Sequence, residues 1–194
     1  MRVMSLDAST STIGVAILDN DNGKTKLFHQ EYYKPPGSDE CTIFERLLNI
    51  KKYLIAKLNE YKPDEFVIED IVMFMRGKSG AKTIIPLALF NRTLGLTYYE
   101  WSGKLPHLLN VLTIRHCLKF SKELPAKEDM PQIVAKHLGI PFPYYYKTNK
   151  KTKLQEIMEE SMDVADAISV GLAFIFINVE KRPKIKYLVK KRKK

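Results

Sequence analysis

The hydrophobic pattern of the chain opens with two short β-prone runs on either side of a turn of small residues. The first run begins at Arg2 and ends on an acid, Asp7, and the second covers 12–18. A turn rich in Asp, Asn and Gly then predicts a third strand, Lys24–Tyr32, antiparallel to the second. Because an unpaired charge is costly to bury at the end of a central strand, we interpret Asp7 as a residue that holds a cation.

Helical periods dominate the rest of the chain, with short strands between them. An apolar stripe predicts an amphipathic helix over 40–60, and the run 65–69 predicts a short buried strand. The later elements are predicted as a helix over 84–101, a strand over 106–112, a helix with Asp129 as N-cap that ends at Leu138, one or two helical turns over 154–162, and a buried helix over 163–178. Residues 113–120 fit neither period. This order predicts an α/β fold in which helices flank a central, mixed, five-stranded sheet.

Charge is concentrated at the C-terminal end. The chain has 194 residues and a net charge of +10, and 181–194 contains nine basic residues and no acid. Removing those nine from +10 leaves 1–180 at +1, so we divide the chain into one domain, 1–180, and a basic tail, 181–194. Such a tail is typical of sequence-independent attraction to phosphates. A solubilising end and a nuclear-localisation-like run are the alternatives.

The composition also narrows the cellular setting. The longest apolar run, 170–179, is too short to span a bilayer, and the first residues lack the hydrophobic region of a signal peptide. Cys41 and Cys117 match no metal or redox spacing. We therefore expect an intracellular, cytoplasmic protein that is not secreted and has no membrane partner.

Four acids stand at the ends of predicted elements. Asp7 and Glu69 end strands, while Asp163 and Asp166 lie three residues apart in the expected first turn of the last helix. Hard oxygen ligands of this kind favour Mg²⁺ or Mn²⁺ over Zn²⁺. If the four converge, two ions roughly 3.5–4 Å apart would make a phosphodiesterase site that leaves a 5′-phosphate. Spacing alone does not decide whether they converge.

The segment 71–83 mixes apolar residues, bases and glycines without a clear period. Phe74 stands among Arg76, Lys78 and Lys82, a combination that suits a loop pressed against nucleic acid. The alternative is that Phe74 simply packs beneath the loop.

The order of these motifs resembles the ribonuclease-H-like superfamily and, within it, the RuvC family of Holliday junction resolvases, over roughly 1–178. The motifs are Leu6-Asp7-Ala8-Ser9, Gly14-Val15-Ala16-Ile17, Pro63-Asp64 followed by Ile68-Glu69, and Asp163-Val164-Ala165-Asp166-Ala167-Ile168. The resemblance implies a ribonuclease-H-like fold, ligation of two Mg²⁺ by the four acids, and a homodimer that nicks opposed strands of a four-way DNA junction symmetrically.

The same resemblance assigns roles to further residues. It places part of the dimer interface on the predicted helix 84–101 and an aromatic residue near the crossover at Phe74. It matches Lys127 to a basic residue important for catalysis, and it leaves a second basic position open among Arg115, His116 and Lys119. The chain departs from the family pattern in three places: the longer segment between Pro141 and Asp163, the basic tail, and extra residues in the loop after Glu69. These departures suggest a divergent, phage- or organelle-type member.

Three other interpretations use the same residues. The turn after Asp7 also resembles the phosphate-binding hairpin of sugar kinases and actin-like ATPases, but those proteins need two such domains and an adenosine motif that is missing here, so we predict no nucleotide cofactor. A ribonuclease H that cuts RNA in hybrids would use the same acids as a monomer. In a non-catalytic nucleic-acid-binding module, the acids would be helix caps and strand ends.

Overall fold

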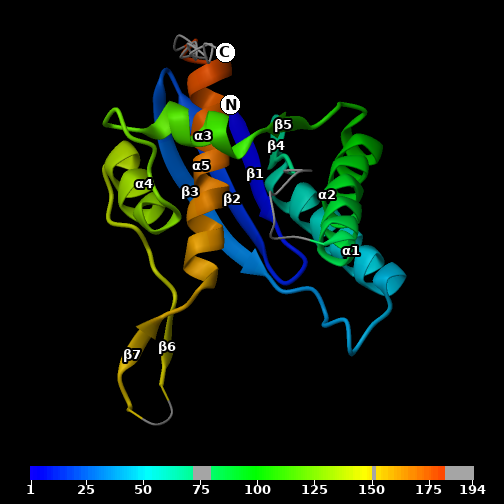
Figure 1. Cartoon of the computed structure of the whole chain (residues 1–194). Helices are drawn as coiled ribbons and strands as arrows, with labels where there is room; N and C mark the ends of the chain where they lie inside the picture. Colours follow the sequence, from blue (N-terminus) through cyan, green and yellow to red (C-terminus); the bar gives the residue numbers. More distant parts are fainter. Residues whose placement is uncertain (72–79, 150–151, 182–194) are drawn as a thin grey trace, which may run out of the picture.

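A five-stranded sheet forms the centre of the computed structural model, which describes residues 1–71, 80–149 and 152–181. The strand order is β3-β2-β1-β4-β5 (Figure 1). The strands are β1 (Arg2–Ala8), β2 (Ile13–Asp21), β3 (Lys24–Tyr33), β4 (Glu65–Glu69) and β5 (His107–Leu109). β1 pairs antiparallel with β2 and parallel with β4, so the predicted mixed sheet is confirmed.

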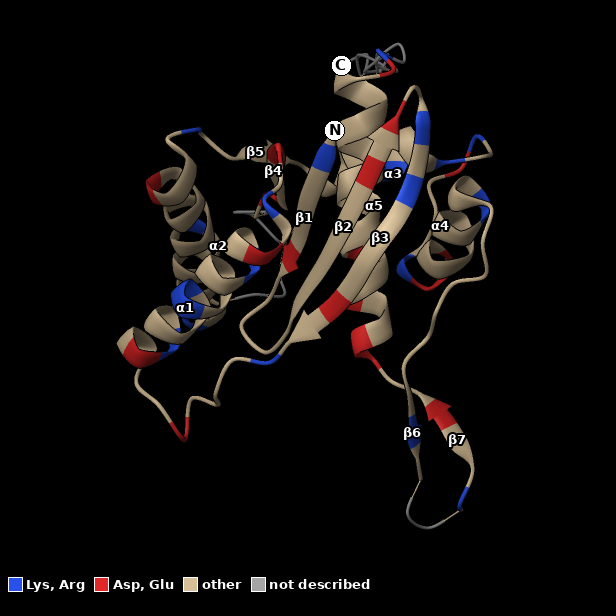
Figure 2. Ribbon diagram, turned by 180° about the vertical axis from the view of Figure 1, so that it is seen from behind, with Lys and Arg blue, Asp and Glu red and all other residues tan. Residues whose placement is uncertain are grey.

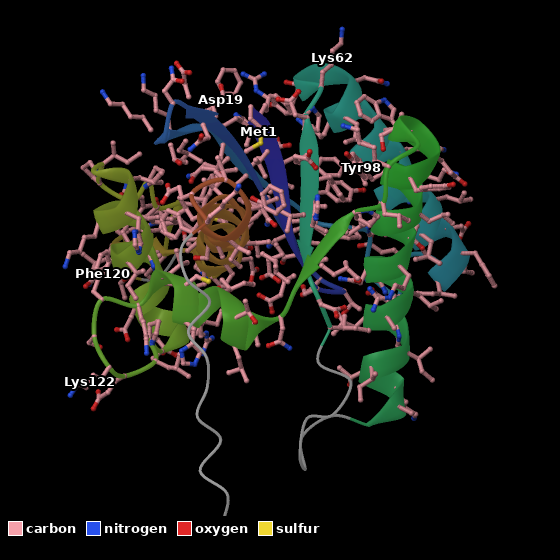
Figure 3. All side chains as sticks on the ribbon, turned by 90° about the horizontal axis from the view of Figure 1, so that it is seen from above. Met1, Asp19, Lys62, Tyr98, Phe120 and Lys122 are labelled. Carbon is pink, nitrogen blue, oxygen red and sulfur yellow. The ribbon has the colours of Figure 1, made fainter. Side chains whose placement is uncertain are left out.

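Helices cover both faces of the sheet. α1 (Ile43–Tyr61) and α2 (Ala81–Ser102) lie on one face, and α3 (Val111–Leu118), α4 (Met130–Leu138) and α5 (Glu160–Asn178) lie on the other. Figure 3 shows this arrangement from above, with Tyr98 of α2 on one side of the strands and Phe120, after α3, on the opposite side. No helix in the described ranges is long and apolar enough to cross a membrane.

Alternation along β1 sends its side chains into two separate cores. Met4 and Leu6 pack with the residues of α1 and α2. Val3 packs with α3, α4 and α5. Asp7 therefore faces α5, because it shares the face of Val3 and Ser5. The sequence pattern of β1 thus decides which helix meets the acid.

Two glycines allow α5 to approach the sheet closely. A Cβ added at Gly14 of β2 would lie 2.6 Å from the carbonyl carbon of Asp163, and one added at Gly171 of α5 would lie 2.6 Å from the Ser5 hydroxyl oxygen. Real side chains do not tolerate such distances, so both positions require glycine. The close approach brings the start of α5 over the ends of β1 and β2.

The predicted helix starts need small corrections. α1 begins at Ile43 behind a capping box, in which Thr42 accepts from the Glu45 amide and the Glu45 carboxylate accepts from Thr42. α5 begins at Glu160, so Asp163 lies in its first turn and Asp166 lies beyond it. The predicted N-cap Asp129 and the helix end at Leu138 are confirmed, but the Asp129 carboxylate makes no capping bond to α4 and instead accepts from the Ala126 amide across a 3₁₀ turn, Lys127–Asp129.

Two other predictions around the later elements are only partly confirmed. The strand expected over 106–112 is limited to His107–Leu109, and the ambiguous 113–120 segment falls mainly in α3, which Asn110 caps by accepting from the Leu112 amide. Of the helical turns expected over 154–162, residues 160–162 are helical as the start of α5, whereas Gln155–Ile157 form strand β7, which pairs with β6 (Tyr146–Thr148). Figures 1 and 2 show this hairpin projecting away from the sheet, beyond the N-terminal end of α5.

Candidate active site

The first two acids of the site lie on neighbouring parallel strands. Leu6 of β1 is paired with Ile68 of β4, and Asp7 and Glu69 are the residues that follow each of them. Both acids face the side of the sheet that α5 covers, as Val3 and Val67 on the same strands show. Because the carboxyl ends of parallel strands meet at one edge of the sheet, the two carboxylates come together there.

The second pair of acids comes from α5. Asp163 and Asp166 are three residues apart on the helix, so they share the face that meets the sheet. Gly14, the β2 partner of Asp7, lies under the main chain of Asp163. The missing side chain at Gly14 therefore sets how closely Asp163 and Asp166 approach Asp7.

Electrostatics shows that the four carboxylates act on one another. Burial raises the pKa of Asp7 well above its usual range, and the negative charges of Glu69, Asp166 and Asp163 raise it further. Burial, followed by the charge of Asp166, raises the pKa of Glu69 to about 7. Burial also raises the pKa of Asp163 and of Asp166. The cluster therefore favours protons or cations at this edge of the sheet.

Lys127 supplies one such cation from the 3₁₀ turn before α4. Its Nζ lies 3.5 Å from Oδ1 of Asp163 and 3.3 Å from Oδ2 of Asp166. Burial lowers the pKa of Lys127, but the charges of Asp166, Asp163 and Asp7 outweigh it and raise the pKa overall. The structure thus brings Lys127, to which the family resemblance assigned a catalytic role, against Asp163 and Asp166.

A second cation, Arg115 of α3, acts on the same cluster. Its positive charge lowers the pKa of both Glu69 and Asp166, against the effect of burial. This favours Arg115 among the three basic candidates left open by the sequence. His116 is a poorer cation, because burial and the charge of Lys119 lower its pKa.

Sequence comparison gives relatives that carry one name. A relative from Dehalococcoides mccartyi named crossover junction endodeoxyribonuclease RuvC is 28% identical over 105 residues, which cover 52% of this chain and 62% of the relative. The protein of the same name from Syntrophomonas wolfei is 31% identical over 88 residues, which cover 45% of this chain and 48% of the relative. The chain thus spans about half to three-fifths of these relatives. No family model matches it.

Solved structures agree over a longer stretch. RuvC from Thermus thermophilus in complex with Holliday junction substrate superposes with a TM-score of 0.69 at 17% identity, over 91% of this chain and 94% of that one. The yeast mitochondrial Holliday junction resolvase Ydc2 gives 0.59 at 14% identity, over 89% and 77%. The chain is similar in sequence to these RuvC proteins over about half its length, and it has the fold of RuvC. Its fold is the ribonuclease-H-like fold that the sequence predicted.

The donor chemistry of this carboxylate cluster fits a divalent metal. All four acids offer hard oxygen ligands, and their raised pKa values show negative charge that no full set of partners offsets. Within 1–71, 80–149 and 152–181, however, no group of three or more Asp, Glu, His or Cys side chains is already arranged to bind a metal ion. Lys127 lies between Asp163 and Asp166 in this arrangement.

One contact that the sequence did not reveal fixes the Glu69 main chain. Asn91 is buried on α2, and its Nδ2 donates to the Glu69 carbonyl oxygen at 2.9 Å. Beside it, Arg92 pairs with Asp70 at 3.0 Å. The sequence signal for this role was limited to a single Asn within an apolar helix. Without the fold, that signal does not identify Glu69 as the hydrogen-bond partner.

The structure describes one of the four residues predicted to contact DNA. Phe74, Arg76 and Lys78 lie outside the described residues. Lys82 is exposed in the first turn of α2. The proposed role of these four side chains in DNA binding remains a prediction.

A cleft of about 810 Å³ opens next to the carboxylates. Asp163 and Lys127 line it, together with the 9–12 turn between β1 and β2 and the buried Arg46 of α1. Arg46 donates to the Thr10 carbonyl oxygen and lies 4.9 Å from the Phe90 ring centroid. Asp163 is therefore reachable from an open, hydroxyl-rich side of the molecule, and the other three acids lie behind it.

Proposed function

We propose that this chain is a structure-specific endodeoxyribonuclease that resolves four-way DNA junctions by paired, symmetric nicks. The observation that carries the proposal is the convergence of Asp7, Glu69, Asp163 and Asp166, with Lys127 against them, at one end of a RuvC-like sheet. The relatives named for crossover junction cleavage support the choice of substrate.

The four carboxylates would hold two Mg²⁺ ions, and Mn²⁺ would substitute for them. Bound there, the ions would supply activation of a water molecule and stabilisation of the leaving 3′ oxygen, which yields a 5′-phosphate. Lys127 would retain its proton next to Asp163 and Asp166, since those charges raise its pKa. Its ammonium can then stabilise added negative charge on a phosphate in the cleft.

Other side chains hold this arrangement in place. Asn91 fixes the main chain at Glu69, Arg115 keeps Glu69 and Asp166 closer to their ionised forms, and Gly14 lets α5 approach. These contacts come from both helical layers and from the sheet. A site held by several rigid elements keeps its carboxylates in position without large rearrangement when a substrate binds.

Paired nicks require two active sites, and α2 offers a surface that could join them. Ile85, Leu89, Leu96 and Tyr99 are all exposed large hydrophobic residues on this helix. They lie opposite Phe90, Leu94 and Tyr98, which pack into the core. An apolar stripe of this kind on a surface helix favours association, and it supports the proposed homodimer through α2.

The proposal is tested by giving purified full-length chain with Mg²⁺ three substrates: a four-way DNA junction, a linear duplex of the same sequence, and an RNA–DNA hybrid. We expect symmetric nicks in opposed strands, confined to the junction. Cleavage of the hybrid alone would identify a ribonuclease H. Binding of DNA without cleavage of any substrate would identify a non-catalytic module and contradict the proposal.

A further inference from the structure

The β6–β7 hairpin is an element that the carboxylate chemistry does not use. It projects from the end of the molecule where α5 begins, the end that also carries Asp163 (Figures 1 and 2). β7 ends at Ile157 and α5 starts at Glu160, so the hairpin is directly continuous in sequence with the helix that carries Asp163 and Asp166. A strand held at those acids would therefore lie at the same end of the fold as the base of the hairpin.

The hairpin is attached rigidly at its base. The Tyr145 amide donates to the Ser161 hydroxyl at 2.9 Å, and the Met158 amide donates to the Tyr145 carbonyl at 2.9 Å. The Tyr145 hydroxyl donates to the Gln30 carbonyl of β3, and its ring meets the Tyr32 ring edge-on at 5.0 Å between centroids. These contacts tie the hairpin to the sheet and to α5 together, so it has a fixed direction.

The two strands sort their side chains onto two faces. Tyr146 is paired with Ile157, and these side chains share one face with the Thr148–Gln155 pair. Tyr146 is 54% exposed and Ile157 is 47% exposed. The other face carries Lys147 opposite Glu156, and the Glu156 carboxylate accepts from Asn149 at 2.6 Å. One face is therefore an exposed aromatic and aliphatic pair flanked by polar groups.

The exposed pair gains little packing within the described part of the chain, where the Tyr146 ring makes a tilted contact with the Tyr144 ring, 6.4 Å between centroids. A two-stranded hairpin with six exposed strand residues has little core of its own, so leaving about half of Tyr146 and Ile157 in water costs free energy with little gain in packing. An exposed aromatic beside an aliphatic side chain is the combination that proteins insert against base steps or stack on unpaired bases.

We propose that the Tyr146–Ile157 face of the hairpin is a wedge that contacts the nucleobases of a DNA strand next to the cleavage site. The occupant is DNA because the hairpin extends from the end of the fold that carries the carboxylates, and because Lys147 and Lys153 lie exposed on the same hairpin, where they can meet phosphates. The inference rests on the proposed function, since it requires a DNA strand at Asp163. The wedge would favour branched DNA, whose bases unstack more easily than those of a continuous duplex.

The test compares the wild-type chain with the double variant Tyr146→Ala/Ile157→Ala. Phe44→Ala/Leu48→Ala is the matched control, because these are also exposed large hydrophobic residues, on α1. Binding is measured in EDTA to a four-way junction that carries 2-aminopurine next to the crossover, and to a linear duplex of the same sequence.

We expect the hairpin variant to bind the junction about tenfold more weakly, to bind the duplex almost as well as wild type, and to lose the 2-aminopurine fluorescence increase. The control variant should match wild type. Equal weakening on both DNAs, or no change on either, would overturn the inference. A shift from dimer to monomer with unchanged binding would overturn it too and identify a subunit contact. If the wild-type chain bound junctions but cut none, the proposed function would be refuted and the wedge proposal would still stand. The binding comparison distinguishes the two because it needs no cleavage.

Discussion

Gly14 of β2 lies directly against the main chain of Asp163, so close that a Cβ at Gly14 would stand 2.6 Å from the Asp163 carbonyl carbon. The contact joins the strand next to Asp7 to the helix that carries Asp163 and Asp166. Because neither backbone can move without disturbing a core layer, this one position links the packing of the fold to the geometry of the acids.

Gly14→Ala is therefore expected to push the start of α5 away from the sheet. Overpacking of this kind costs about 1–3 kcal/mol of the free energy of unfolding, and cleavage should fall by more than that loss of folded protein explains. Urea unfolding and nicking rates at a temperature where the variant is folded separate the two effects. Gly80→Ala is the control for the unfolding measurement, since a Cβ there meets no atom within 4 Å. It is not used as a control for cleavage, because Gly80 lies in the 71–83 segment predicted to meet DNA. An alanine at Gly14 that cuts as well as wild type would show that the close approach is dispensable.

Much of this site could be predicted from the sequence because its acids end regular elements. Alternation placed Asp7 and Glu69 at strand ends, and an all-apolar run headed by acids located Asp163 and Asp166. Asn91 and Arg115 could not be assigned in this way, because their roles come from contacts between residues 22 or more positions apart in the sequence, such as Asn91 to Glu69.

The errors have a related physical cause. Strands β6 and β7 contain three residues each, which is too short for a period of two to stand out from neighbouring polar sequence. Asp129 has the residue type and the following proline of an N-cap, yet its carboxylate turns back to the Ala126 amide because a 3₁₀ turn precedes α4. The sequence pattern of an N-cap thus identified the right residue, but the hydrogen bond that Asp129 makes is to Ala126 and not to α4.

Asp7→Asn should abolish cleavage and leave junction binding intact. The variant removes one charge from a cluster in which burial and three neighbouring carboxylates raise the pKa of Asp7, so the metal-free protein should also become more stable near neutral pH. Nicking assays, gel-shift titrations and thermal unfolding in EDTA provide the three measurements. Weak binding together with residual cutting would contradict the assignment of Asp7 to the metal site.

The stability of the metal-free protein should depend on pH through Glu69. Its pKa rises from 4.5 to about 7 on folding, so the folded state binds the proton more tightly than the unfolded state. This contribution to stability is fully present below about pH 4.5 and is lost as the pH rises towards 7. Urea titrations in EDTA across this range, compared with Glu69→Gln, isolate it. The variant should show a flatter profile, and Mg²⁺ should restore stability to wild type near pH 7. Profiles of wild type and variant that run parallel would contradict the assignment.

The basic segment 181–194 should contribute affinity without contributing chemistry. Deleting its nine positive charges removes phosphate contacts, so junction binding should weaken and the slope of log affinity against log salt should become shallower. Titrations at several salt concentrations measure the slope, and cleavage at saturating protein should persist. A salt slope identical to that of the full chain would exclude phosphate contacts by the segment.

Lys127 offers a test of whether a fixed positive charge, separate from the metal, takes part in the reaction. Its ammonium lies 3.5 Å from Asp163 and 3.3 Å from Asp166, on the side of the cleft. Lys127→Ala should reduce kcat by roughly 100-fold or more while KM changes little, since the charge is needed most when negative charge builds up on the phosphate. Lys127→Arg should recover part of the rate because it keeps the charge but alters the geometry.

Lys136→Ala is the control for this prediction. It removes a lysine on the last turn of α4 that instead stacks over Phe120, so it should leave kcat unchanged. If Lys127→Ala raised KM alone, the Lys127 ammonium would contribute to substrate binding and not to the chemical step. The negative charge on the reacting phosphate would then be offset by metal ions bound to the carboxylates.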